Sequence, residues 1–147
     1  MTLVVATGTF DLLHPGHVLY LERSRALGDE LVVIVARDVN VRHKPKPILP
    51  EEQRRRMIAA LKVVDRAILG EEKDIFQTIE QLRPDVITLG YDQHFDEDLL
   101  QEELFRRGIQ CRVVRITERE PCALCGSSRI MARILERYRV RRIQSRP

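Results

Sequence analysis

Two short apolar runs constrain the fold more than any other feature: LVVAT at residues 3–7 and LVVIVA at residues 31–36. Both are rich in β-branched side chains and too short for a buried helix, which indicates strands covered on both faces, as in a parallel sheet. The segment between them reads as a helix, since Pro15 suits a first helical position and Gly28 can end it. The chain therefore begins as strand, loop, helix and strand.

The rest of the chain repeats this alternation. Helix starts are indicated by a proline followed by acidic residues, or by a carboxylate in a capping position, at Pro50, Asp74 and Asp96. Three further strands are expected at residues 66–70, 85–90 and 111–116, and a last helix near Ser127 or Ser128. The basic residues after that helix are expected to fray.

This order predicts an α/β protein with a Rossmann-like, doubly wound, parallel five-stranded sheet. We expect a single domain over residues 1–138, followed by a basic tail at 139–147. In this fold class ligands bind beyond the carboxyl ends of the strands. Candidate site residues are therefore sought in the loops that follow each strand.

Composition excludes several classes of protein. A length of 147 residues with 44% hydrophobic side chains suits one buried core. The 25 basic and 22 acidic side chains nearly cancel, so no nucleic-acid partner is expected. No apolar run approaches the ~20 residues that span a membrane, and no secretion signal is visible, so we expect a cytoplasmic protein without a membrane partner. Its three cysteines are expected to be reduced.

The segment TGTFDLLHPGH, residues 7–17, joins the first strand to the first helix. It matches neither the P-loop nor the dinucleotide fingerprint. Its place at the sheet edge, beside a helix N-terminus, favours an anion site. His14 and His17 are three apart and can reach one phosphate, while Gly16 lets a ligand approach the backbone. Taken alone, this pair could instead cap the helix, which is the commoner case, or supply half of a metal site.

As a whole, GTFDLLHPGH resembles the signature of the cytidylyltransferase-like nucleotidyltransferases, a family with a Rossmann-like sheet. The resemblance implies that the segment, with Thr9 and Phe10, holds the triphosphate of a nucleotide. His14 and His17 would bind the phosphates and stabilise charge that builds on the α-phosphate. Asp11 would fix the loop or help to hold a divalent metal ion.

The resemblance assigns phosphate contacts to two further cations, Lys44 in the loop after the second strand and Arg54 in the second helix. Without it, Lys44 reads as solvated surface, and Arg54, which lies on the inward stripe of its helix, as one half of a structural ion pair. Gly90 and Asp92 would hold the base and ribose, although this segment could be a plain turn.

Ser127 and Ser128 match a serine/threonine pair of the family and could bind phosphate, or could simply cap the last helix. The family reaches this pair through an arginine-threonine-x-glycine segment. Here the stretch is RITEREPCALCGSS, and Arg115 and Arg119 are both candidates for the arginine.

Cys122 and Cys125 depart from the family pattern. A C-x-x-C pair can be half of a zinc site, a redox pair or two small buried residues. Zinc is disfavoured because no second ligand pair lies nearby. We therefore regard both thiols as candidates for redox sensitivity.

Within the family, the stretches VARD, PEEQRRRMIAAL, VDRAILG and LGYDQ are similar to archaeal-type FAD synthetases. This similarity implies FMN adenylyltransferase activity: AMP passes from ATP to FMN, giving FAD and pyrophosphate, with a divalent ion such as magnesium and a homodimeric enzyme. The alternatives are a glycerol-3-phosphate cytidylyltransferase that uses CTP, a regulator that binds nucleotide or flavin without catalysis, and a nucleic-acid binder that uses the basic tail.

Overall fold

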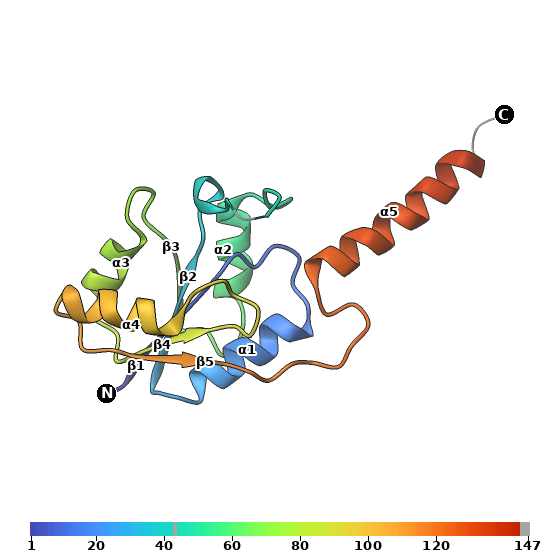
Figure 1. Cartoon of the computed structure of the whole chain (residues 1–147). Helices are drawn as coiled ribbons and strands as arrows, with labels where there is room; N and C mark the ends of the chain where they lie inside the picture. The colour runs from blue at the N-terminus through green and yellow to red at the C-terminus, as the bar shows by residue number, and fades with distance from the viewer. Residues whose placement is uncertain (43, 145–147) are drawn as a thin grey trace.

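The computed structural model describes residues 1–42 and 44–144, with side chains described up to residue 139. Its sheet is parallel throughout, in the strand order β3-β2-β1-β4-β5 (Figure 1). The strands are β1 (Leu3–Gly8), β2 (Glu30–Val35), β3 (Arg66–Leu69), β4 (Val86–Leu89) and β5 (Arg112–Arg115). The helices are α1 (Pro15–Arg25), η1 (Asp38–Asn40), α2 (Glu51–Ala59), α3 (Ile75–Leu82), α4 (Glu97–Arg106) and α5 (Ser127–Gln144). The predicted fold class is confirmed.

The central strands are buried on both faces, as their uninterrupted apolar sequences require. Alternate residues of β1 and β2 point into two separate cores. One core contains Leu21 of α1 and Ile58 of α2, and the other contains Ile79 of α3 and Leu104 of α4. The sheet is therefore covered by two helices on each side, which is the doubly wound arrangement.

The helices begin where the capping residues predict. Asp74 accepts a hydrogen bond from the Phe76 amide, and Asp96 accepts hydrogen bonds from the amides of Asp98 and Leu99. Pro50 is the N-cap of α2, so its fixed φ angle leads directly into the helix. The predicted helix starts are confirmed. They could be predicted from the sequence because each cap involves only groups a few residues away.

The last helix begins at Ser127, as expected, and it continues to Gln144, into the segment expected to fray. Residues 139–144 continue α5, and no glycine or proline interrupts them. Figure 1 shows α5 leading away from the rest of the molecule. Residues 145–147 of the expected tail lie outside the described residues.

β1 and β4 are neighbours in the sheet, yet the helices that follow them cover opposite faces. The chain therefore diverges at their carboxyl ends and leaves a crevice, the place where ligands bind in this fold class. Tyr20 of α1 joins the two strands at this point. Its buried hydroxyl accepts a hydrogen bond from the Thr7 amide at 3.2 Å and donates to the Thr88 carbonyl at 2.9 Å.

None of the described helices combines the length and apolar character that crossing a membrane would require.

Candidate active site

His14 occupies the N-cap position of α1. Its Nδ1 accepts a hydrogen bond from the Gly16 amide at 3.1 Å, so the capping role that the sequence allowed is confirmed. Burial lowers the pKa of His14, and the nearby Asp92 carboxylate partly counteracts this effect. Since Nδ1 is an acceptor, the neutral ring carries its proton on Nε2. That N–H is available as a donor to a ligand.

His17 lies one turn further along α1, and its ring stacks on that of His14 with centroids 3.8 Å apart. Burial, with smaller contributions from His14 and Lys44, lowers the pKa of His17 from 6.5 to about 3. Its Nδ1 is buried and has no hydrogen-bond partner among the described residues. A buried polar atom without a partner costs stability, which is typical of a functional site rather than of a structural contact.

Phe10 forms the floor beneath His17. Its buried ring meets the His17 imidazole edge-on, with centroids 5.4 Å apart. Its φ angle of 54° is in the left-handed region, which is rare for a bulky side chain. Any Cβ at Gly8 would lie 2.7 Å from the Phe10 ring, so this packing requires the glycine. The strained loop thus orients the catalytic candidate.

Gly16 is required for a different reason from the one expected. The sequence suggested that it lets a ligand approach the backbone, whereas a Cβ at Gly16 would lie 2.9 Å from the His14 ring. The missing side chain therefore makes room for the histidine that caps the helix.

Asp11 fixes the loop, which is the first of the two roles that the resemblance allowed. Its two carboxylate oxygens accept hydrogen bonds from the amides of Ile48 and Leu49, at 2.9 and 3.0 Å. This contact holds the 44–49 loop against the β1–α1 loop. Lys44 in the same segment is exposed, and its charge contributes to the lowered pKa of His17.

The expected metal ion finds no protein-built site. Within residues 1–42 and 44–144, no three histidine, cysteine, aspartate or glutamate side chains converge on one point. Both oxygens of the carboxylate at Asp11 are already used by backbone amides.

Arg54 is buried completely, with a side-chain exposure of 0%. Its guanidinium donates to the carbonyls of Thr9, Ala36 and Leu49, and makes an ion pair with Asp38 at 2.7 Å. The structural ion pair that the sequence allowed is therefore present. Through it, one side chain holds together the loop after β1, the end of β2 and the start of α2.

Gly90 and Gln93 enclose a tight turn after β4. The Gly90 amide donates to the Gln93 side chain at 2.6 Å, and that side chain also reaches the Thr7 hydroxyl at 3.4 Å. The turn is thereby tied to the end of β1. Asp92 is exposed, close enough to His14 to influence its pKa.

The two arginine candidates before α5 have different surroundings. Arg115 donates to the carbonyls of Gly90 and Gln93 and pairs with Glu97 at 2.7 Å, so it serves to hold the turn. Arg119 lies over the ring of Tyr91, at 4.4 Å from its centroid. Its guanidinium has no hydrogen-bond partner among the described residues, which leaves Arg119 as the candidate for a ligand contact.

The start of α5 is hydrogen-bonded to the loop between β1 and α1, residues 9–14, which we call the histidine loop. The Ser127 hydroxyl donates to the Leu12 carbonyl at 3.0 Å, while Ser128 is exposed.

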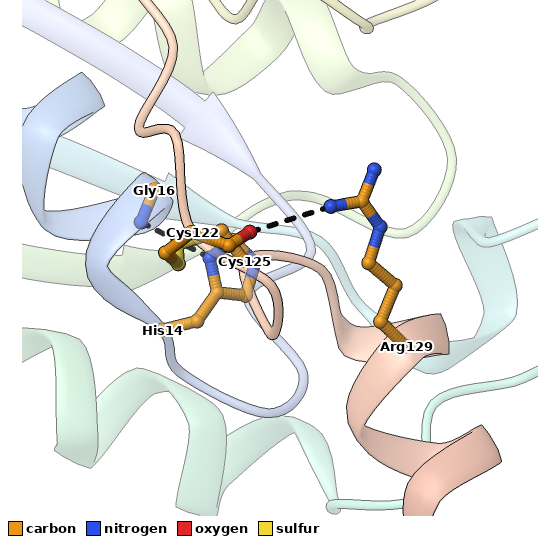
Figure 2. The surroundings of a disulfide bond; sticks show 5 residues. All are labelled: His14, Gly16, Cys122, Cys125 and Arg129. Carbon is orange, nitrogen blue, oxygen red and sulfur yellow. Dashed lines mark hydrogen bonds between the residues drawn. A yellow bond between two sulfur atoms is a disulfide. The ribbon is translucent and has the colours of Figure 1, made fainter.

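The prediction of reduced thiols was wrong for Cys122 and Cys125, which form a disulfide because their turn brings the Cα atoms within 5.3 Å. Figure 2 shows this disulfide beside His14 and Gly16. Cys111 is a free, buried cysteine, as expected.

The predicted site residues therefore lie around one edge of the sheet: Thr9, Phe10, Asp11, His14, His17, Lys44, Arg54, Gly90, Asp92, Ser127 and Ser128. Sequence reasoning missed the supporting roles of Tyr20, Asp38 and Gln93. A tyrosine on the inward face of α1 should have signalled a buried hydroxyl in need of a partner. An arginine on the inward face of α2 likewise required a carboxylate partner. Asp38, which follows the second strand at the same edge of the sheet, was the carboxylate to consider.

Comparison with known proteins gives this site a family. The family model described as cytidylyltransferase-like matches residues 5–133. An FAD synthase of Methanothrix thermoacetophila is 66% identical over 136 residues, which cover 92% of this chain and 95% of that protein. An FAD synthase of Archaeoglobus fulgidus is 62% identical over 134 residues, covering 91% and 98% of the two chains.

Solved structures agree on the fold. A protein of Thermoplasma volcanium, titled a lipopolysaccharide core biosynthesis protein, has a TM-score of 0.79 and 52% identity, covering 82% of this chain and 99% of its own. A pantoate-beta-alanine ligase of Francisella tularensis has a TM-score of 0.60 at 17% identity, covering 89% of this chain and 65% of its own. The second likeness concerns the fold alone.

Proposed function

The chain belongs to the cytidylyltransferase-like family, and from this membership we propose that it is an FAD synthase, an FMN adenylyltransferase that transfers AMP from ATP to FMN. The observation that carries the proposal is the 66% identity to an FAD synthase over 92% of the chain. The convergence of the histidine loop, the turn after β4 and the start of α5 at one sheet edge supports it.

In this reaction an oxygen of the FMN phosphate attacks the α-phosphorus of ATP. A new P–O bond forms while the bond from the α-phosphorus to the bridging oxygen breaks, and its electron pair leaves with pyrophosphate. The attacking oxygen is already anionic, so no strong base is required. The protein contributes mainly by aligning the two phosphates and by stabilising the charge that develops between them.

Neutral histidines at a helix N-terminus can supply that stabilisation. The Nε2–H of His14 and the ring of His17 lie together at the N-terminus of α1, where the helix dipole also favours an anion. We assign the triphosphate to this place, with Lys44 and Arg119 as exposed cations and Ser127 and Ser128 as further donors. Gly90 and Asp92 are assigned to the nucleoside.

Arg54 is assigned a positioning role rather than direct contact with phosphate. A guanidinium that already donates to three carbonyls and one carboxylate has little capacity left for a ligand. By holding the Thr9 carbonyl and the start of α2, it fixes the loop that carries the histidines.

A divalent ion, most simply magnesium, would enter with the phosphates of ATP, which supply the oxygen ligands that this ion prefers. The cytoplasmic location stays a prediction, as do the absence of nucleic-acid and membrane partners and the homodimer.

The test is a matrix of pyrophosphate release. ATP or CTP is combined with FMN, glycerol 3-phosphate, phosphocholine or phosphopantetheine, each with magnesium and with other divalent ions. FAD formed from ATP and FMN is the expected result. Turnover only with CTP and glycerol 3-phosphate would identify a cytidylyltransferase instead, and no turnover in any combination would indicate a binding protein.

A further inference from the structure

The chain has few aromatic rings on which a planar ligand could stack. It contains three tyrosines, four phenylalanines and no tryptophan. Two of these residues, Tyr91 and Phe95, lie in the turn after β4, at the carboxyl edge of the sheet, and are 46% and 41% exposed. The other five are used or placed elsewhere: Phe10 beneath His17, Tyr20 between β1 and β4, Phe76 under Arg107, Phe105 on α4 and Tyr138 on α5.

The turn after β4 is held firmly by its own hydrogen bonds. Arg115 donates to three of its carbonyls, those of Gly90, Gln93 and Phe95. The Gln93 side chain in turn accepts from the Gly90 amide at 2.6 Å. Tyr91 therefore presents its exposed ring from a fixed backbone, and a ligand that stacks on it loses little conformational entropy of the protein.

Tyr91 lies beside the place assigned to the phosphates. The guanidinium of Arg119 is 4.4 Å from its ring centroid and has no hydrogen-bond partner among the described residues. The next residue, Asp92, is close enough to His14 to influence its pKa. The phosphate of FMN must come within bonding distance of the α-phosphorus, so a ring beside these groups is within reach of the remainder of FMN.

The flavin ring system suits such a platform. Isoalloxazine consists of three fused, electron-poor rings, and a phenol ring is electron-rich, so the two stack favourably in an offset arrangement. Arg119 covers part of the Tyr91 ring, but an exposed contact of a cation with a ring is weak and can be displaced.

We infer that Tyr91 is the residue on which the isoalloxazine ring of FMN stacks, and that this contact selects FMN over small phosphorylated acceptors. A compound such as glycerol 3-phosphate has no ring and gains nothing from Tyr91. The inference rests on the proposed function and adds to it the group that recognises the acceptor.

Equilibrium binding tests this inference without catalysis. Isothermal titration calorimetry measures the Kd of FMN in the presence of α,β-methylene-ATP, which cannot transfer AMP. Tyr91→Leu should raise this Kd at least about fivefold, the usual loss when an aromatic ring that stacks on a base is removed. Tyr91→Phe should bind as the parent protein does, because stacking does not require the hydroxyl.

Phe105→Leu is the matched control, since Phe105 is an exposed aromatic residue of α4, away from the site, and its loss should leave FMN binding unchanged. Melting curves check that all variants fold. Fluorescence supplies a spectroscopic signature, because flavin emission is quenched by a stacked tyrosine: the parent protein should quench FMN, and Tyr91→Leu should quench it less.

Steady-state kinetics gives a second, separate readout. Tyr91→Leu should raise the KM for FMN, while kcat at saturating FMN and the KM for ATP change little, because the flavin ring is remote from the bonds that form and break.

The possible failures are distinguishable. If the parent protein binds FMN and Tyr91→Leu binds it equally well, the inference is overturned and the proposed function stands. A variant that loses affinity for the ATP analogue rather than for FMN would assign Tyr91 to adenine and also overturn it. A parent protein that binds no FMN, with or without the analogue, would overturn the proposed function and this inference with it.

Discussion

At the scale of single residues, His17 combines properties that structural histidines avoid. It is largely buried, it stacks on a second histidine, and its Nδ1 has no partner among the described residues. His17→Ala should keep the fold and lower turnover by at least ~100-fold, the usual loss when a donor at developing charge is removed. Steady-state kinetics with a melting curve measures both. Turnover near that of the parent protein would remove His17 from the phosphate site.

The same residue predicts a pH dependence of stability. The folded protein keeps His17 neutral down to about pH 3, whereas the unfolded chain takes up a proton near 6.5. The unfolded state therefore binds more protons in this window, and the contribution of His17 to stability falls as pH decreases through it. Urea unfolding at several pH values should show this slope, and His17→Asn should reduce it. An identical slope in the variant would contradict the lowered pKa.

Arg54 was expected from the sequence to serve phosphates, in which case Arg54→Met would be as stable as the parent protein. The structure reverses this expectation, because the substitution leaves three carbonyls and a carboxylate without their donor. We expect Arg54→Met to lower the free energy of unfolding by roughly 2–5 kcal/mol and activity with it.

Thermal and urea unfolding measure this loss, and Arg56→Met, an exposed arginine of the same helix, is the control. Arg54→Lys should not restore stability, since an ammonium cannot reproduce the fork of the guanidinium. An unchanged melting temperature with lost ATP binding would instead assign Arg54 to the phosphates.

At the scale of elements, the segment between β5 and α5 carries Cys122 and Cys125 and lies against the histidine loop. The Cβ of Cys125 lies 4.0 Å from the position of a Cβ on Gly16, and Ser127 is bound to Leu12. Alkylation of Cys122 or Cys125 in the reduced protein should therefore impair catalysis, and ATP should protect. Mass spectrometry identifies the modified residue.

Cys111 is the internal control for this experiment. It is buried, and burial raises the pKa of its thiol to about 11, so it should stay unmodified in the folded protein. The double variant Cys122→Ser/Cys125→Ser should resist inactivation. Unchanged kinetics in that variant, together with no effect of alkylation on the parent protein, would show that the pair is structural.

At the scale of the whole molecule, stability is distributed unevenly. The central strands β1, β2 and β4 contain residues with almost no exposure, whereas α5 has few neighbours in its own chain. Hydrogen exchange should be slowest in these strands and fastest in α5 beyond its first turns. Exchange in α5 as slow as in β1 at low concentration would contradict this picture.

Much of the architecture is determined by the sequence through local interactions. The apolar runs of β1 and β2 can only be buried on both faces, and Pro50, Asp74 and Asp96 cap helices through groups two or three residues away. The histidine loop is also local, because a spacing of three on one helix turn brings His14 and His17 together whatever the rest of the chain does.

Only the tertiary structure decides contacts between residues distant in sequence. Arg54 meets the Thr9 carbonyl across 45 positions and Ser127 meets the Leu12 carbonyl across 115, and no periodicity encodes such distances. Which of Arg115 and Arg119 can contact a ligand likewise depends on tertiary contacts. Arg115 already donates a hydrogen bond to the Gly90 carbonyl in the turn after β4, whereas Arg119 lies over the ring of Tyr91. The sequence alone determines which elements form and at which edge of the sheet the candidate site lies, because these follow from short-range geometry and burial. Packing of the whole chain decides which charged groups stay free for the ligand, because hydrogen bonds to distant segments use up the others.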